Sequence, residues 1–182
     1  TVYQVPNVND CKRCHISNKK LIPIGPKARN LNYTVHGQSQ NQLTNWAAKG
    51  ILTGLPDVNT IERLPDWQDG KKYSLEERAR AYLDINCSYC HTKGGDAYNT
   101  GLFLEYDQHD PNHIGIMKIP VSAGGGAGGL NYDIVPGNAD SSILHYRMNS
   151  TEPGTAMPEL NRTIIHKEGV ALIREWINRM KK

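Results

Sequence analysis

Residues 74–91 read SLEERARAYLDINCSYCH, and this stretch decides how the rest of the chain is interpreted. Ser74 and Glu77 fit the S-x-x-E capping box that starts many helices. One apolar face follows at helical spacing, made by Leu75, Ala79, Tyr82 and Leu83. The stretch therefore predicts a helix that runs to about Asn86 and ends in a Cys-x-x-Cys-His sequence.

All four cysteines lie in two copies of this pattern, Cys11-Lys12-Arg13-Cys14-His15 and Cys87-Ser88-Tyr89-Cys90-His91. The pattern is the attachment signature of c-type haem. Two cysteines three positions apart on a helical turn can each form a thioether to one vinyl group of the same porphyrin, and the next His can bind its iron. The sequence therefore predicts two covalently bound haem c groups, with His15 and His91 as iron ligands.

Three other interpretations of the cysteines compete with haem. Paired zinc knuckles usually lie about 15–20 residues apart, whereas 72 residues separate Cys14 from Cys87. A thioredoxin-like redox pair would need a βαβ setting, and none is visible. Two Cys-x-x-Cys disulfides would be strained and are usually catalytic. Because the whole motif occurs twice and leaves no cysteine over, haem is the preferred interpretation.

The composition is lean for a domain of this length. Of 182 residues, 38% are hydrophobic, one is Phe, and 17 Gly and 10 Pro interrupt regular structure. Such a core offsets chain entropy poorly unless something else fills it, as two haem macrocycles would. The net charge of +3 and the absence of a Lys/Arg stripe argue against nucleic acid. No stretch approaches the ~20 apolar residues of a transmembrane segment.

The second iron needs a sixth ligand, and Met157 is the best candidate. It lies between Pro153-Gly154 and Pro158, and the two prolines stiffen the loop and lower the entropy cost of holding sulfur on iron. A thioether ligand favours the ferrous state and raises the potential. Filling a gap in the core is the alternative role for Met157, and Met148 is the reserve ligand.

The sixth ligand of the first haem is left open. His36 is the only His between the two motifs, where no Met occurs, so it is a tentative iron ligand. Solvation is the commoner state of a His in a polar loop. His145 and His166 are alternative ligands from the second half of the chain, and a vacant position would allow ligand or peroxide chemistry.

The expected fold class is all-α, with small helical cytochrome c-like haem domains, long irregular loops and one short β-hairpin. A boundary near residue 70 would separate an N-terminal haem segment with its linker, 1–70, from a second domain, 71–182. Further helices are expected at about 39–49 and about 167–180, and the hairpin would pair residues 101–106 with 116–120. The apolar face of the last helix consists of Leu172, Ile173, Trp176, Ile177 and Met180.

The order of helix, haem motif, irregular middle, methionine loop and closing helix resembles a class I cytochrome c domain over residues 71–182. Nearly the whole chain also resembles a family of bacterial di-haem c-type cytochromes. The segments that carry this second resemblance are residues 5–8, 25–32, 78–83, 135–137, 142–144, 157–160 and 168–177. The resemblance implies two haems and a periplasmic or cell-surface location.

We therefore expect an electron carrier or relay that works with redox protein partners, rather than an enzyme. A di-haem peroxidase-like enzyme with an open first haem is one alternative, and a haem-bearing subunit of a larger complex or filament is another. Covalent haem attachment implies export, so we expect a leader outside this numbering.

Overall fold

The computed structural model describes residues 5–160 and 163–181. Within these residues it contains seven α-helices, four short 3-10 turns and one two-stranded sheet. The α-helices are α1 (Val8–Cys14), α2 (Ala28–Leu31), α3 (Gln42–Ala48), α4 (Leu75–Asn86), α5 (Pro111–Ile114), α6 (Ile143–Met148) and α7 (Lys167–Arg179). The 3-10 turns are η1 (Val58–Thr60), η2 (Tyr98–Thr100), η3 (Gly124–Ala127) and η4 (Ala139–Ser141). The strands are β1 (Ile16–Ser17) and β2 (Lys20–Leu21).

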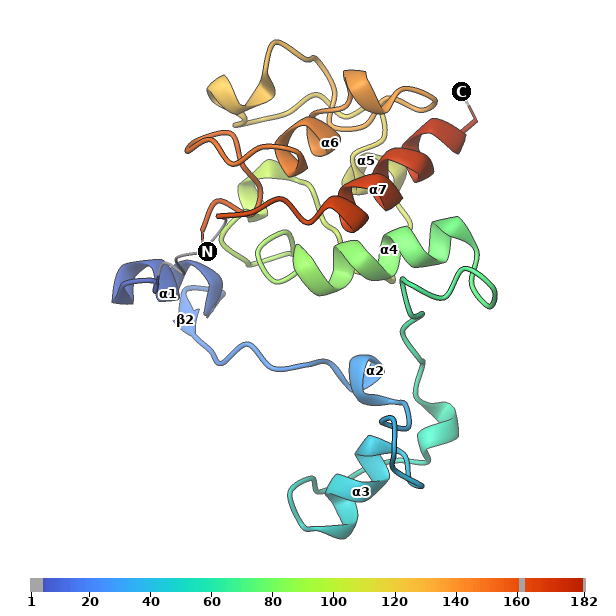
Figure 1. The fold of residues 1–182 in the computed structure, drawn as a ribbon. Coiled ribbons are helices and arrows are strands. Elements are labelled where there is room, and N and C mark those ends of the chain that lie inside the picture. The colour runs from blue at the N-terminus through green and yellow to red at the C-terminus, as the bar shows by residue number, and fades with distance from the viewer. Residues whose placement is uncertain (1–4, 161–162, 182) are drawn as a thin grey trace.

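The two longest helices, α4 and α7, pack against each other and organise the larger part of the molecule (Figure 1). Both helices agree with the predicted ranges, and the capping box before α4 is confirmed. The Ser74 N–H donates to the Glu77 carboxylate (2.8 Å), and the Glu77 N–H donates to Ser74 Oγ (3.3 Å). A Cβ at Gly169 would overlap the Tyr82 ring, so the close approach of α7 to α4 requires glycine there.

The core lies between these two helices and the irregular chain that connects them. The apolar faces predicted for both helices are largely buried, with Leu83, Ile173 and Ile177 fully covered, whereas Leu75 and Met180 at their outer ends are partly buried. Loop residues complete the core, including Leu104 and Ile134. Long irregular segments therefore contribute to the core without forming regular structure.

Residues 5–70 lie in two places (Figure 1). The segment with α1, β1 and β2 contacts the larger part of the molecule, whereas α2 and α3 lie apart from it. Lys27 nevertheless reaches the buried Asp84 of α4, with Nζ 2.5 Å from the carboxylate oxygen. The domain boundary near residue 70 stays a prediction, and ion pairs cross that position.

The predicted all-α class is wrong. The described residues contain the antiparallel sheet β1–β2, isolated β-bridges and extensive irregular chain between the helices. The turn that joins β1 to β2 has positive φ at Asn18 (49°) and Lys19 (64°), as a tight hairpin turn requires. Strands of two residues are too short for a periodic pattern, so this hairpin is not predictable from hydrophobic periodicity.

The hairpin predicted between residues 101–106 and 116–120 does not form. Within residues 101–106, the Leu104 N–H donates to the His91 carbonyl (2.9 Å) and the Phe103 N–H to the His113 carbonyl (2.8 Å). Ile116 makes a parallel bridge with Ile134 instead. The expected helix at 39–49 is shorter, because the Asn41 side chain caps it by accepting from the Leu43 N–H (2.9 Å).

In the part of the chain that the structure describes, each helix is too short or too polar to cross a membrane.

Candidate haem-attachment site

The second Cys-x-x-Cys-His sequence continues directly from α4. The Cys87 N–H donates to the Leu83 carbonyl (2.9 Å), which extends the helical hydrogen bonding past Asn86. The Cys90 and His91 N–H groups then both donate to the Cys87 carbonyl, at 3.2 and 2.9 Å. These bonds make one tight turn, which brings both thiols and the imidazole to the wall of one cavity.

This cavity has a volume of about 590 Å³, within the range of pockets that hold small molecules and cofactors, about 300–1,000 Å³. Its apolar walls include Leu102, Leu104 and Val121. The residues with ligand or attachment chemistry on its wall are Cys14, Cys87, Cys90, His91, Met148, Met157 and His166. Of the predicted site residues, the structure thus brings five together: Cys14, Cys87, Cys90, His91 and Met157.

His91 is partly buried, with its Nδ1 fully covered, in a way that suits a metal ligand. Burial lowers the pKa of its imidazole, and the positive charge of Arg147 adds to this, while the Leu102 backbone opposes it. The ring is therefore neutral at pH 7, the state in which imidazole binds metals. Its buried Nδ1 has no hydrogen-bond partner of good geometry, which is costly unless some other group occupies the site.

Met157 lies on the cavity wall, half-buried, in the irregular segment before α7. Arg147 of α6 holds this segment in place. Its carbonyl accepts the Met157 N–H (3.1 Å), and its Nε donates to the Thr155 carbonyl (2.9 Å). The reserve ligand Met148 also borders the cavity, but it is buried in the hydrophobic core.

The first motif has a more open setting. An Asn7–Asp10 capping box starts α1, which contains Cys11 and Cys14 and has no buried residue. Cys11 is exposed and Cys14 is partly buried. His15 Nδ1 lies 3.1 Å from both the Ile22 carbonyl and the Ile24 amide nitrogen. The tautomer that donates from Nδ1 to Ile22 leaves Nε2 available as a ligand.

The structure does not bring the tentative ligand His36 to the first motif. His36 is exposed in the turn between α2 and α3, a segment that lies apart from α1 (Figure 1). His145 is buried in α6, and burial lowers the pKa of its imidazole. His166 borders the cavity beside Tyr82, whose hydroxyl lies 2.9 Å from His166 Nδ1.

Comparison with known proteins adds no relative. No family model, no curated protein and no solved structure matches this chain.

The residues of the site fit haem c. Thiols, a neutral imidazole and a thioether are the groups that attach haem c and bind its iron. The apolar cavity, with a histidine nitrogen that lacks a partner, is the environment such a group would fill. This fit is strongest for the second motif, where Cys87, Cys90, His91 and Met157 line one cavity.

Sequence reasoning missed the charged residues around the cavity. Arg13 pairs with Asp96 (3.1 Å) and with Glu159 (2.7 Å), and Arg147 also approaches Glu159 (3.5 Å). These partners are up to 146 positions apart in the sequence, so no local sequence pattern predicts the ion pairs. Glu159 is two residues from Met157, which gave the only available sign that it lies near the site.

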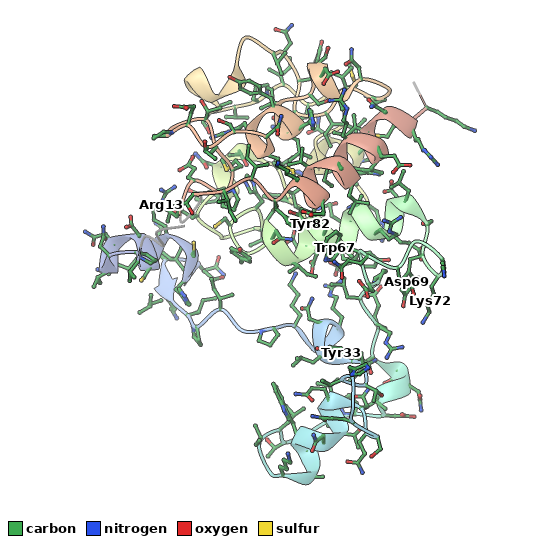
Figure 2. The ribbon with its side chains drawn as sticks, in the orientation of Figure 1. Arg13, Tyr33, Trp67, Asp69, Lys72 and Tyr82 are labelled. Carbon is green, nitrogen blue, oxygen red and sulfur yellow. The ribbon has the colours of Figure 1, made fainter. Side chains whose placement is uncertain are left out.

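An aromatic cluster at the cavity edge was also missed. The Trp67 and Tyr82 rings meet edge to face at 5.4 Å, and Tyr82 stacks on His166 at 5.6 Å. Figure 2 shows Trp67 and Tyr82 next to each other at α4. Tyr82 was predicted only as part of an apolar helix face.

Proposed function

We propose that this chain is a di-haem c-type cytochrome that passes electrons between redox protein partners in the periplasm or at the cell surface. The observation that carries the proposal is the single cavity that Cys87, Cys90, His91 and Met157 all line. His91 and Met157 are 66 positions apart in the sequence, and both border this cavity with donor atoms suited to a His/Met iron site.

When bound, haem supplies a one-electron redox centre. The residues of this chain would attach it, orient it and set its potential. Cys87 and Cys90 would provide the thioethers, His91 a neutral nitrogen and Met157 a sulfur that favours the ferrous state. Leu102 and Leu104 exclude water from one side of the cavity, which also raises the potential by disfavouring charge. Arg147 keeps Met157 at the wall.

The proposal is tested by producing the protein with an N-terminal export signal in a bacterium that makes c-type cytochromes. We expect a mass increase of two haems that persists after denaturation, because thioethers are covalent. The purified protein should be reduced and reoxidised by small cytochrome partners within milliseconds to seconds in stopped-flow measurements. A protein without covalent haem would contradict the proposal.

One observation favours a second function, a di-haem peroxidase-like enzyme. Met157, which lines the same cavity as His91, would provide a sixth ligand for one haem, whereas the segment with His36 lies apart from α1 and the first motif (Figure 1). An open first iron would bind CO when reduced and react with peroxide when oxidised. CO binding together with peroxide-dependent oxidation of a reduced cytochrome would favour this enzyme, and no change with either reagent would favour the electron carrier.

A further inference from the structure

Arg13 of the first motif reaches the cavity that the second motif lines. It lies between Cys11 and Cys14 in the sequence, and it borders the same cavity as His91 and Met157. Figure 2 shows Arg13 at the junction between α1 and the larger part of the molecule. The side chain of Arg13 is neither a thiol nor an iron ligand, so haem attachment does not explain why it lies there.

The Arg13 guanidinium makes ion pairs with two separate segments of the cavity lining. Its Nε lies 3.1 Å from the carboxylate of Asp96, which follows the second motif by five residues. A terminal nitrogen donates to the carboxylate of Glu159 (2.7 Å), two residues after Met157. Both carboxylate residues line the cavity. One side chain therefore links the segment after His91 to the segment that contains Met157.

Glu159 is shared with Arg147 of α6, which holds the same segment from its other side. The Arg147 guanidinium lies 3.5 Å from Glu159, and its Nε donates to the Thr155 carbonyl (2.9 Å). The Arg147 carbonyl accepts the Met157 N–H (3.1 Å). The side chain of Arg147 is 12% exposed and that of Arg13 is 44% exposed. A largely buried arginine of α6 and a more exposed arginine of the first motif thus hold residues 155–159 together.

The first motif does not depend on Arg13 alone for its place beside the second. The Asn18 N–H donates to the Gly94 carbonyl (3.0 Å). Gly94 has a positive φ of 85°, and a Cβ there would lie 2.5 Å from the Asn18 side-chain oxygen. This backbone contact therefore requires glycine. Because it is independent of Arg13, loss of the Arg13 side chain should leave α1 in place and affect the Met157 segment.

We propose that Arg13 is a positioning residue for Met157, through which the first motif controls how firmly the second haem keeps its methionine ligand. This inference rests on the proposed function. Movement of the Met157 segment away from the cavity would separate the Glu159 carboxylate from the Arg13 guanidinium, so the ion pair opposes that movement. Because exposed ion pairs contribute modestly, we expect effects of about twofold to fivefold on ligand displacement.

Displacement of the methionine by added imidazole tests the proposal on the two-haem protein. The weak far-red methionine-to-iron band disappears when imidazole replaces the sulfur, so the band follows this ligand alone. Arg13→Gln should keep two covalent haems and the band, but bind imidazole about twofold to fivefold more tightly than the wild type. Peptides that contain Met157 should also exchange amide hydrogen faster in this variant, because the segment opens more often.

Lys12 provides the matched control. It is exposed in the same motif and has no ion pair among the described residues, so Lys12→Gln should match the wild type in imidazole affinity and in hydrogen exchange. Arg13→Lys keeps the positive charge and should recover part of the wild-type behaviour. Added salt should move the wild type toward Arg13→Gln, because exposed ion pairs are screened.

A double-mutant cycle shows whether Arg13 acts through Glu159. If it does, Arg13→Gln/Glu159→Gln should bind imidazole little more tightly than Glu159→Gln alone. Effects that multiply in the double variant would contradict a shared contact and overturn the inference.

The remaining outcomes separate this inference from the proposed function. Equal imidazole affinity and equal hydrogen exchange in Arg13→Gln, Lys12→Gln and the wild type would overturn the inference and leave the proposed function standing. A two-haem wild type without the far-red band would do the same, because no methionine would then be held on iron. A chain that carries no covalent haem would overturn both.

Discussion

The two Cys-x-x-Cys-His sequences share one pattern and have opposite surroundings. Cys87–His91 extends a 12-residue helix packed into the core, and its histidine is partly buried with Nδ1 fully covered. Cys11–His15 ends a seven-residue helix without a buried residue, held from outside by ion pairs and one hairpin. The comparison teaches that the motif specifies the attachment chemistry, whereas the flanking sequence determines how firmly each site is built.

Removing each pair of cysteines should give the largest contrast. Cys87→Ser/Cys90→Ser would leave the 590 Å³ cavity without the covalent haem proposed for it, and loss of such packing is comparable with the ~5–15 kcal/mol that stabilises a domain. We expect that variant to lose cooperative unfolding and yield, whereas Cys11→Ser/Cys14→Ser should stay folded with one haem. Thermal unfolding followed by far-ultraviolet circular dichroism measures both. An equal loss of cooperative unfolding in both variants would contradict the idea that the second site is built more firmly than the first.

Replacing Met157 tests the ligand set of the better built site. Met157→Leu should abolish the weak far-red methionine-to-iron band and lower the potential of one haem, by part of the ~0.8 V range that axial ligands control. Met148→Leu conserves volume and should cost less than about 1.5 kcal/mol while keeping the band. Redox titration with absorption spectroscopy provides the measurement. Loss of the band in the Met148 variant alone would make Met148 the iron ligand and Met157 a packing residue.

Replacing Lys27 tests how strongly the segment before α2 is held to α4 by its ion pair with Asp84. Lys27→Met removes the cation 2.5 Å from Asp84, whose side chain is only 1% exposed. The buried carboxylate keeps other donors, such as the Tyr106 N–H (3.0 Å), so we expect a loss of about 1–3 kcal/mol. Urea unfolding measures it. The exposed Lys49 is the control, and Lys49→Met should change stability by less than about 0.5 kcal/mol.

Acid sensitivity should be confined to the region around the second motif, and it is the smallest effect expected. Burial lowers the pKa of His145 in the folded state below its unfolded value near 6.5. The unfolded chain then binds a proton that the folded chain does not, so stability falls as pH drops below about 6.5. His145→Gln should flatten this slope in urea titrations between pH 7.5 and 5. An unchanged slope would remove His145 as the cause.

The best predicted parts of the molecule are those with long local patterns. The Ser74–Glu77 capping box and the two apolar faces gave α4 and α7 nearly to the residue. The position of Met157 before the last helix led to a residue that the structure brings to the His91 cavity. In each case neighbouring residues carried the information.

The parts that were missed depend on contacts between distant residues or on single backbone angles. Arg13 has partners at Asp96 and Glu159 that no spacing relates to it. The β1–β2 hairpin depends on positive φ at Asn18 and Lys19, not on strand periodicity. His36 was selected because it was the only histidine in its interval, and the fold carries that interval away from α1 (Figure 1).

The segment that contains His36 also closes on itself. The segment from α2 to residue 64 returns to its starting point, because the Leu64 N–H donates to the Arg29 carbonyl (3.0 Å) and Arg29 pairs with Glu62 (3.3 Å). Because its two ends meet at a narrow neck, the length of this segment does not determine the distance between the chain before Arg29 and the chain after Leu64. Such a neck is a natural insertion point, where the segment could be lengthened, shortened or exchanged without moving the parts of the chain on either side of it.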